Sequence, residues 1–233
     1  MTSPNGSRGE RHSPAQDDFA AQRAAMIESQ VRARGVRDPR VLDAMLRIPR
    51  HLFVPAALAG EAYTDQPLSI GEDQTISQPF IVAAMTEALE LAGAERVLEV
   101  GTGSGYQTAM LAQLTREVIS IEVKSTLAAA ARERLARMGY VNVTVICGDG
   151  SAGYPGRAPY DAILVTAAAP AVPPPLVDQL AEGGRLVIPV GAPEQQELLR
   201  VRKCSGRTTR ELLHYCRFVP LLGSHGWPED EGG

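Results

Sequence analysis

The sequence has few cysteines, and they are not arranged as in a disulfide scaffold or a structural metal site. Cys147, Cys204 and Cys216 are an odd number, and no two of them have C-x-x-C spacing. Reduced thiols are typical of proteins in the cytoplasm, which is the location we expect. We expect no bound metal, because His12, His51, His214 and His225 form no cluster with metal-ligand spacing.

Long apolar runs and an excess of basic residues are absent as well. No stretch of about 18 apolar residues is present, and the first ten residues lack the apolar core of a signal peptide, so we expect no membrane partner. Lys and Arg number 23 against 27 Asp and Glu, a net charge of -4. Nucleic-acid binders usually have a basic surface, so nucleic acid is not an expected partner.

The chain divides into two tails and one domain. Residues 1–18 are rich in Ser, Gly, Pro and charge, which predicts a disordered tail, and we expect a flexible tail at 224–233. Residues 19–223 are predicted to form a single domain, with a helical entry region at 19–92 and an α/β core at 93–223. Within the entry region, Asp38 and Pro39 are typical of a helix start.

The core alternates short apolar runs with helical periodicity. Strands are predicted at 96–100, 118–122, 143–146, 160–165 and 185–190, and helices at 106–114 and 127–138. This order predicts a doubly wound, mostly parallel sheet with helices on both faces, a Rossmann-like arrangement. Two further strands, predicted at 198–201 and 217–221, complete the sheet and are expected to be antiparallel.

A glycine-rich turn follows the first core strand. Glu99 precedes Gly101, Gly103 and Gly105, and the turn opens the helix at 106–114. Glycines at a strand end allow a sharp turn and a close approach to a ligand. In a doubly wound sheet the strand ends share one ligand-binding edge. Glu122, at the end of the second strand, is placed to accept both hydroxyls of a ribose, and Asp149, after the third, is placed to accept from an adenine amino group.

The turn differs from the two common phosphate-binding motifs. Tyr106 stands where the dinucleotide fingerprint requires glycine, and the P-loop Gly-Lys-Ser/Thr pattern is absent. The glycine spacing after Glu99 resembles the first motif of S-adenosylmethionine-dependent methyltransferases. A cationic sulfonium and an amino group also suit acidic surroundings better than they suit a phosphate cradle.

The second candidate site is a serine before a helix. Ser77 lies in the segment Thr75-Ile76-Ser77-Gln78-Pro79, ahead of a helix predicted over 80–91. A helix N-terminus attracts an anion, so Ser77 is either a donor to a substrate carboxylate or a plain helix cap. A carboxylate acceptor needs no general base, because it is already ionised at pH 7.

Five segments, in order along most of the chain, together resemble the protein-L-isoaspartate O-methyltransferase family: residues 74–79, 97–109, 148–150, 159–170 and 217–221. The resemblance implies methyl transfer from S-adenosylmethionine to the free α-carboxylate of L-isoaspartyl residues in damaged proteins, which initiates their repair. It places the catalytic serine at Ser77. The cofactor contacts that it implies are Thr75, Ile76, Ser77, Glu99, Gly101, Gly103, Gly105, Glu122, Asp149 and Gly150, with Glu99 acting indirectly.

Some questions stay open at the level of the sequence. No contact is carried over to Leu222, where some relatives have a hydroxyl residue. We expect isoaspartyl peptides and proteins as partners, and a monomer. The alternatives are a methyltransferase for a small carboxylic acid or an RNA base, a non-catalytic cofactor-binding module, and a nicotinamide dehydrogenase.

Overall fold

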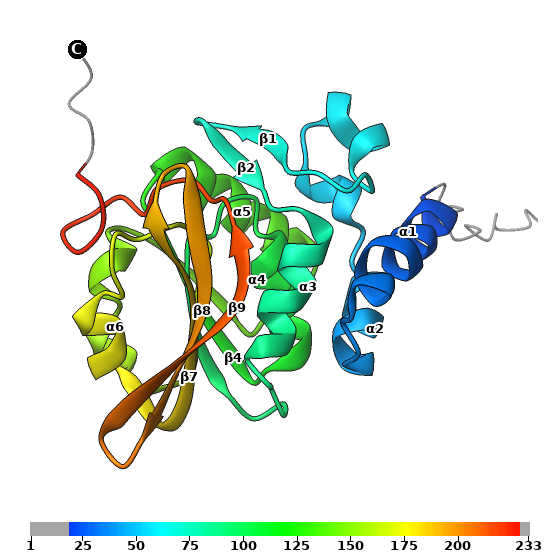
Figure 1. Cartoon of the computed structure of the whole chain (residues 1–233). Coiled ribbons are helices and arrows are strands. Elements are labelled where there is room, and N and C mark those ends of the chain that lie inside the picture. Colours follow the sequence, from blue (N-terminus) through cyan, green and yellow to red (C-terminus); the bar gives the residue numbers. More distant parts are fainter. Residues whose placement is uncertain (1–18, 229–233) are drawn as a thin grey trace, which may run out of the picture.

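The computed structural model describes residues 19–228, and its centre is a seven-stranded sheet (Figure 1). The strand order is β5-β4-β3-β6-β7-β8-β9. The strands are β3 (Arg96–Val100), β4 (Glu117–Glu122), β5 (Val143–Cys147), β6 (Tyr160–Val165), β7 (Leu180–Ala192), β8 (Gln195–Cys204) and β9 (Arg207–Cys216). The strands from β5 to β7 pair in parallel, whereas β8 and β9 are antiparallel. The predicted fold class is therefore confirmed.

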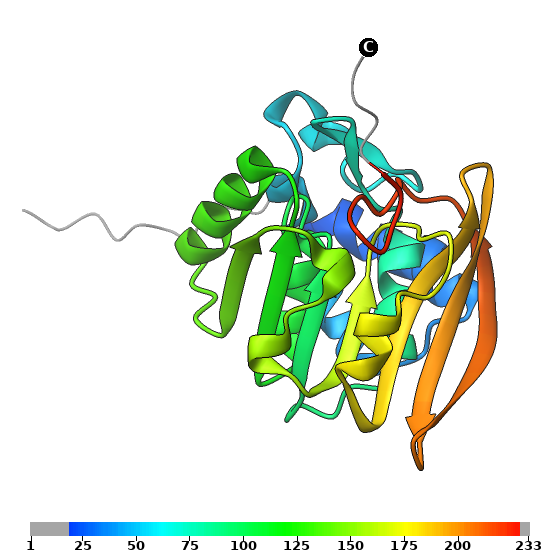
Figure 2. The same cartoon turned by 90° about the vertical axis from the view of Figure 1, so that its left-hand side faces the viewer.

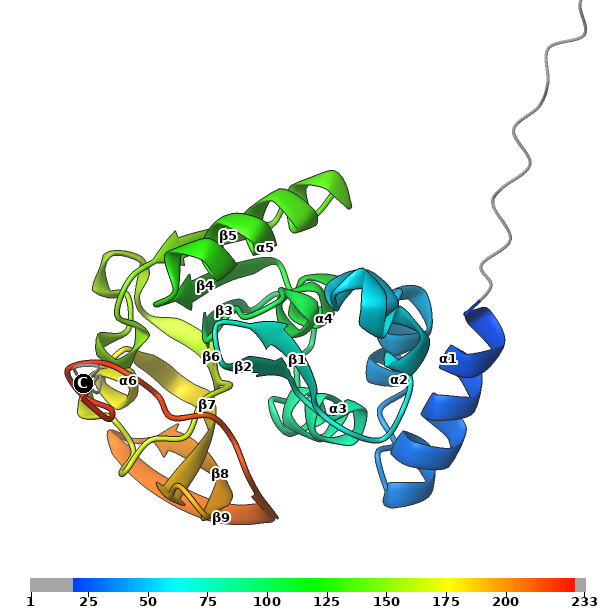
Figure 3. The same ribbon diagram turned by 90° about the horizontal axis from the view of Figure 1, so that it is seen from above.

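Helices cover both faces of this sheet. Figure 3 shows α3 (Pro79–Ala88) and α4 (Tyr106–Leu114) on one side and α6 (Pro174–Asp178) on the other, with α5 (Ser125–Arg137) near β4 and β5. The chain leaves β3 toward β4 and β5, and then returns to β6 on the other side of β3. The topological switch point therefore lies between β3 and β6, where doubly wound folds bind ligands.

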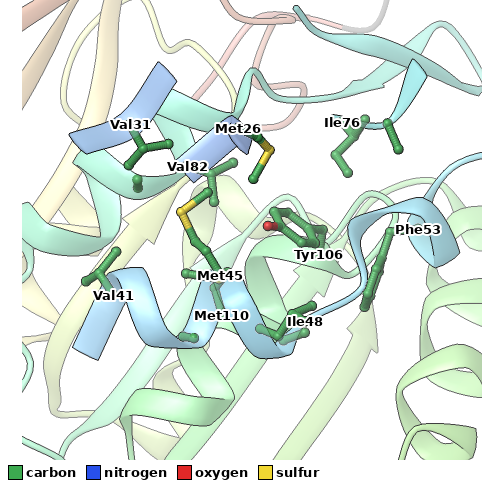
Figure 4. Close-up of a cluster of buried hydrophobic side chains, with 14 of the residues drawn as sticks. Met26, Val31, Val41, Met45, Ile48, Phe53, Ile76, Val82, Tyr106 and Met110 are labelled. Carbon is green, nitrogen blue, oxygen red and sulfur yellow. The ribbon is translucent and has the colours of Figure 1, made fainter. Parts of the chain in front are cut away.

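The entry region forms a second helical layer outside α3 and α4. It contains α1 (Ala20–Met26), continued by the short turns Ile27–Val31 and Arg32–Arg34, then α2 (Pro39–Arg47) and two 3₁₀ turns, Arg50–Phe53 and Ala56–Glu61. The predicted start of α2 is confirmed: the Asp38 carboxylate accepts a hydrogen bond from the Arg40 amide at 2.9 Å. A cap of this kind is worth about 1 kcal/mol. Figure 4 shows Met26, Met45 and Ile76 around Tyr106 in the buried cluster that joins the layers.

Two short segments lie over the carboxyl ends of the parallel strands (Figure 2). One is the hairpin of β1 (Leu68–Gly71) and β2 (Gln74–Ile76), which leads into α3. The other is the chain after β9. It bridges Pro220 to Ala168, and the Trp227 indole N–H donates to the Ala168 carbonyl at 3.0 Å. Both segments therefore border the edge where the ligand is expected.

One predicted strand is wrong in this part of the molecule. Residues 217–221 do not form a strand: the segment makes a single parallel bridge, in which Val219 and Leu221 bond to Ala168, and Pro220 has no amide hydrogen with which to pair on its other side. Residues 224–228, which fall within the tail predicted at 224–233, make defined contacts: the Ser224 amide and hydroxyl both donate to Asp149, and the Trp227 indole donates to Ala168. The tail predicted at 1–18 and residues 229–233 lie outside the described residues.

Candidate active site

The glycine turn after β3 forms the floor of the site. Gly101 has φ +95°, and its amide donates to the Ile121 carbonyl at 2.8 Å. A Cβ at this position would lie 2.3 Å from the Thr166 hydroxyl oxygen, which itself donates to the Gly101 carbonyl at 2.6 Å. The position therefore requires glycine for two reasons: its φ favours glycine, and β6 ends too close to leave room for a side chain.

A cavity opens above this turn, between the ends of β3, β4 and β6 and the hairpin. Glu122 is the only charged residue that lines it among the described residues. One carboxylate oxygen of Glu122 accepts from the Gly103 amide at 2.8 Å, and the other accepts from the Lys124 amide at 3.0 Å. A cavity with one carboxylate and no basic side chain does not suit a pyrophosphate. It suits a ligand that carries hydroxyls and a cation.

The structure brings most of the predicted site residues to this cavity. Seven of the ten line its wall: Thr75, Ile76, Ser77, Gly101, Gly103, Glu122 and Gly150. They come from β2 and the loop before α3, the glycine turn, the end of β4 and the turn after β5. The other three, Glu99, Gly105 and Asp149, do not line it.

Glu99 is buried inside the fold beside the cavity. It is 0% exposed, and one carboxyl oxygen accepts from the hydroxyls of Thr108 in α4 and Ser120 in β4, each at 2.5 Å. Its other oxygen has no partner among the described residues. Burial raises the pKa of Glu99 to about 8, so the carboxyl is mainly neutral at pH 7. Glu99 therefore connects β3 to α4 and β4 and offers no exposed negative charge to a ligand.

Gly105 and Asp149 do not line the cavity and instead contact other parts of the fold. A Cβ at Gly105 would lie 3.2 Å from Leu135, so this glycine allows α4 to pack against α5. Asp149 accepts from the amide and hydroxyl of Ser151 through one oxygen, and from the amide and hydroxyl of Ser224 through the other. These hydrogen bonds hold the pKa of Asp149 at about 2, against the opposing effect of burial. An adenine amino group would have to share these oxygens or displace Ser224.

A second cavity adjoins the first on the side of β9. Its wall includes Arg34, Phe80, His214 and Arg217, and no acidic residue of the described chain lines it. The Arg34 guanidinium stacks on the Phe80 ring at 3.7 Å from the ring centroid. Arg34 also pairs with Asp65 at 3.5 Å, whereas Arg217 has no such partner within residues 19–228, so the wall is basic mainly through Arg217.

Four residues line both cavities: Thr75, Ser77, Thr166 and Val219. Three of them carry hydroxyls. The Thr166 hydroxyl is engaged with the Gly101 carbonyl, whereas the Ser77 hydroxyl makes no hydrogen bond to any residue of 19–228. Gln78, not Ser77, is the N-cap residue of α3, and no side chain caps this helix. The plain helix cap is thus the less favoured interpretation of Ser77.

Several wall residues are absent from the predicted set. Thr166 and Ala167 follow β6, Leu221 is the last residue of the segment that was expected to be a strand, and Leu222 follows it. Leu222, to which the sequence assigned no contact, does line the cavity. Tyr106 and Gln107 begin α4 directly after the glycine turn. Position next to a motif is the only sequence signal that could have identified Tyr106 and Gln107.

The sheet order, the glycine turn and an acidic cavity without a phosphate cradle define an S-adenosylmethionine-dependent methyltransferase. The family model described as Protein-L-isoaspartate(D-aspartate) O-methyltransferase matches residues 21–226. The chain belongs to this protein-L-isoaspartate O-methyltransferase family, and S-adenosylmethionine is its methyl donor.

Individual relatives agree with this assignment. The protein-L-isoaspartate O-methyltransferase of Syntrophus aciditrophicus is 56% identical over 214 residues, covering 91% of this chain and 98% of that protein. The enzyme of the same name from Methanoculleus marisnigri is 56% identical over 211 residues, covering 91% and 96%. A solved structure of a putative protein-L-isoaspartate O-methyltransferase from Plasmodium falciparum, in complex with S-adenosyl-L-homocysteine, has a TM-score of 0.75 at 26% identity, covering 89% of this chain and 99% of that one.

Proposed function

We propose that the chain carries out the reaction of its family where the two cavities meet. It transfers the methyl group of S-adenosylmethionine to the free α-carboxylate of an L-isoaspartyl residue in a damaged protein, which initiates repair. The donor occupies the cavity above the glycine turn, and the isoaspartyl peptide occupies the basic cavity. The observation that carries this proposal is the uncommitted Ser77 hydroxyl in the wall that the cavities share.

The residues of the first cavity fit the methyl donor. We assign Glu122 to the ribose hydroxyls, and Gly101 and Gly150 allow the strand ends that form the floor of this cavity to pack closely against Thr166 and Val100. When bound, S-adenosylmethionine supplies an electrophilic methyl carbon on a sulfonium. The remaining task of the chain is to hold the acceptor in line with that carbon, because proximity and orientation are the main contribution to a transfer of this kind.

The chemistry at the acceptor requires no proton transfer. A carboxylate oxygen forms the new C–O bond while the C–S bond breaks, and the electron pair stays on sulfur, which becomes neutral. The products are a methyl ester and S-adenosyl-L-homocysteine. We assign Ser77 as the catalytic residue, because its hydroxyl is free to donate to the acceptor carboxylate and hold it at the junction of the two cavities.

The basic cavity supports a peptide acceptor in preference to a nucleic acid base. Arg217 is exposed in its wall and makes no ion pair or hydrogen bond within residues 19–228, and Arg34 stacks on Phe80 nearby. A basic wall of this kind attracts the carboxylate of the isoaspartate and those of acidic residues next to it in the peptide. We propose that the enzyme acts as a monomer in the cytoplasm, and the three unpaired cysteines agree with that location. Among the described residues no helix is long and apolar enough to cross a membrane.

The experiment uses methyl-labelled S-adenosylmethionine with an isoaspartyl peptide and the matching aspartyl peptide. We expect a base-labile labelled ester on the isoaspartyl peptide alone. Cofactor binding without any ester would favour a non-catalytic module, and label on RNA or on a small acid alone would favour another acceptor. Tight NAD binding without S-adenosylmethionine binding would favour a dehydrogenase.

The role of Ser77 is tested in the same assay. Ser77→Ala is expected to lower kcat by about tenfold or more, short of the 10²–10³ cost of deleting a strong transition-state donor, with little change in cofactor affinity. The matched control is Ser69→Ala, which removes an exposed hydroxyl from β1, in the hairpin that precedes Ser77, outside both cavities. Unchanged turnover of Ser77→Ala would remove Ser77 from the mechanism.

A further inference from the structure

A buried arginine lies directly behind Ser77. Arg50 begins the 3₁₀ turn Arg50–Phe53 in the entry region and is 0% exposed, the largest fully buried side chain of the described residues. It lines neither cavity. Its side chain nevertheless reaches the segment that carries the catalytic hydroxyl, 27 residues further along the chain.

The guanidinium connects three parts of the site. Its Nε donates to the Ala62 carbonyl at 2.7 Å, and one terminal nitrogen donates to the carbonyl of Ser77 at 2.8 Å. Its central carbon lies 5.0 Å from the centroid of the Tyr106 ring, and Tyr106 lines the cofactor cavity. Figure 4 shows that ring among the apolar side chains of the cluster, which include Met26 and Phe53.

The charge of Arg50 is not explained by a salt bridge. Among residues 19–228 no carboxylate pairs with it, and its second terminal nitrogen has no hydrogen-bond partner. Burial lowers its pKa to about 10, so it remains a cation at neutral pH. A buried charge without a partner is costly, and an apolar side chain of similar length would fill the space without that cost. Packing alone therefore does not account for an arginine at this position.

We propose that Arg50 is a positioning residue for methyl transfer, which fixes the peptide group of Ser77 so that its hydroxyl faces the acceptor carboxylate. The guanidinium is rigid and planar, and two of its hydrogen bonds fix the distance between the Ala62 and Ser77 carbonyls. The Ser77 segment is irregular: it has left β2, and α3 begins only at Pro79. Without the guanidinium, no other side chain of the described residues holds the Ser77 carbonyl.

The inference rests on the proposed reaction, and the test separates the two. Methyl transfer by the unchanged enzyme is measured first, since its failure would overturn the reaction itself. Arg50→Lys then keeps the positive charge but loses the planar guanidinium that makes both hydrogen bonds, and Arg50→Met loses the charge as well. The matched control is Arg23→Lys. Arg23 is a buried arginine of the same layer that donates to the Tyr63 hydroxyl, whereas the side-chain hydrogen bond to the Ser77 carbonyl comes from Arg50.

We expect Arg50→Lys to lower kcat by about tenfold, and by no more than Ser77→Ala does, because Arg50 acts through the Ser77 hydroxyl and a displacement of about 1 Å in a reacting group is costly. The dissociation constant of S-adenosyl-L-homocysteine should change less than about threefold. Arg23→Lys should lower the unfolding temperature but leave kcat within about threefold of the unchanged enzyme. Arg50→Met should lose at least as much kcat as Arg50→Lys.

A double variant distinguishes a positioning role from a purely structural one, because it measures whether the loss of kcat in Arg50→Lys depends on the Ser77 hydroxyl. If Arg50 acts through the Ser77 hydroxyl, Arg50→Lys should cost little further kcat in an enzyme that already carries Ser77→Ala. Losses that multiply in the double variant would overturn the proposal. A normal kcat in Arg50→Lys would also overturn it. So would a loss of kcat in Arg50→Lys that equals the loss in Arg23→Lys when both variants are destabilised to the same extent.

Discussion

Replacing Glu99 by glutamine should leave the free energy of unfolding nearly unchanged near pH 5 but should change how that free energy varies with pH. The two hydroxyl donors, Thr108 and Ser120, meet one carboxyl oxygen, and the other oxygen has no partner among the described residues. Glutamine reproduces this arrangement, since its carbonyl can accept both hydroxyl bonds. Near pH 5, where Glu99 is protonated in the folded chain, we expect the free energies of unfolding to agree within about 1 kcal/mol.

The difference should appear as the pH rises. The pKa of Glu99 is raised by burial from 4.5 to about 8, so the folded protein holds this proton between those values and the unfolded chain does not. The free energy of unfolding that the Glu99 proton contributes is therefore fully present below pH 4.5, and it is lost progressively as the pH rises to about 8. At about 1.36 kcal/mol per pKa unit, the upper limit of the loss is on the order of 5 kcal/mol.

The assay is urea unfolding of the natural chain and Glu99→Gln at pH 5, 7 and 9. We expect the variant to become the more stable protein above pH 7, by a few kcal/mol at pH 9. The comparison cancels the titration of other groups, such as Asp149, which both proteins share. A stability difference that stays constant from pH 5 to pH 9 would refute the assignment of a neutral, buried Glu99.

Three further predictions concern the cavities. Gly101→Ala should abolish S-adenosylmethionine binding in calorimetry, because the added Cβ meets the Thr166 hydroxyl. Gly139→Ala, where φ is also positive but the space around the Cβ is open, should bind normally. Equal binding by both variants would contradict the close approach of Thr166 to Gly101. Ser224→Ala should weaken cofactor binding severalfold with unchanged kcat at saturation, since one of the bonds that close the chain over the site is lost; unaltered affinity would show that this closure is irrelevant to the cofactor. Arg217→Gln should remove an advantage in KM, about threefold to tenfold, of isoaspartyl peptides with a neighbouring Glu over those with a neighbouring Gln; no advantage in the natural enzyme would dismiss the basic wall as a determinant of specificity.

The sequence predicted the parts of the fold that repeat a strong local pattern. The parallel core strands are mostly apolar runs because both of their faces are covered, so the positions of β3, β4, β5 and β6 were confirmed to within one residue, whereas β7 begins five residues before its predicted start. The glycine turn and the strand ends then located the cavity. Seven of the ten predicted site residues line this cavity: four belong to the glycine turn and the strand ends, and Thr75, Ile76 and Ser77 come from the segment before α3 and the family resemblance.

The elements that the sequence missed depend on contacts more than on local pattern. β9 is exposed along most of its length and forms because β8 pairs with it, so its residues show no clear alternation. The β1–β2 hairpin turns at Glu72 and Asp73, both with positive φ, without the Asn-Gly signal of such turns. The contact of Ser224 with Asp149 joins positions 75 residues apart, which no local pattern could indicate.

The most direct test of the account is the structure of the enzyme with S-adenosyl-L-homocysteine and an isoaspartyl peptide. We predict that the free α-carboxylate of the isoaspartate lies at the junction of the two cavities, within hydrogen-bond distance of the Ser77 hydroxyl and facing the cofactor sulfur. A carboxylate bound away from Ser77, with the peptide outside the basic cavity, would contradict the account.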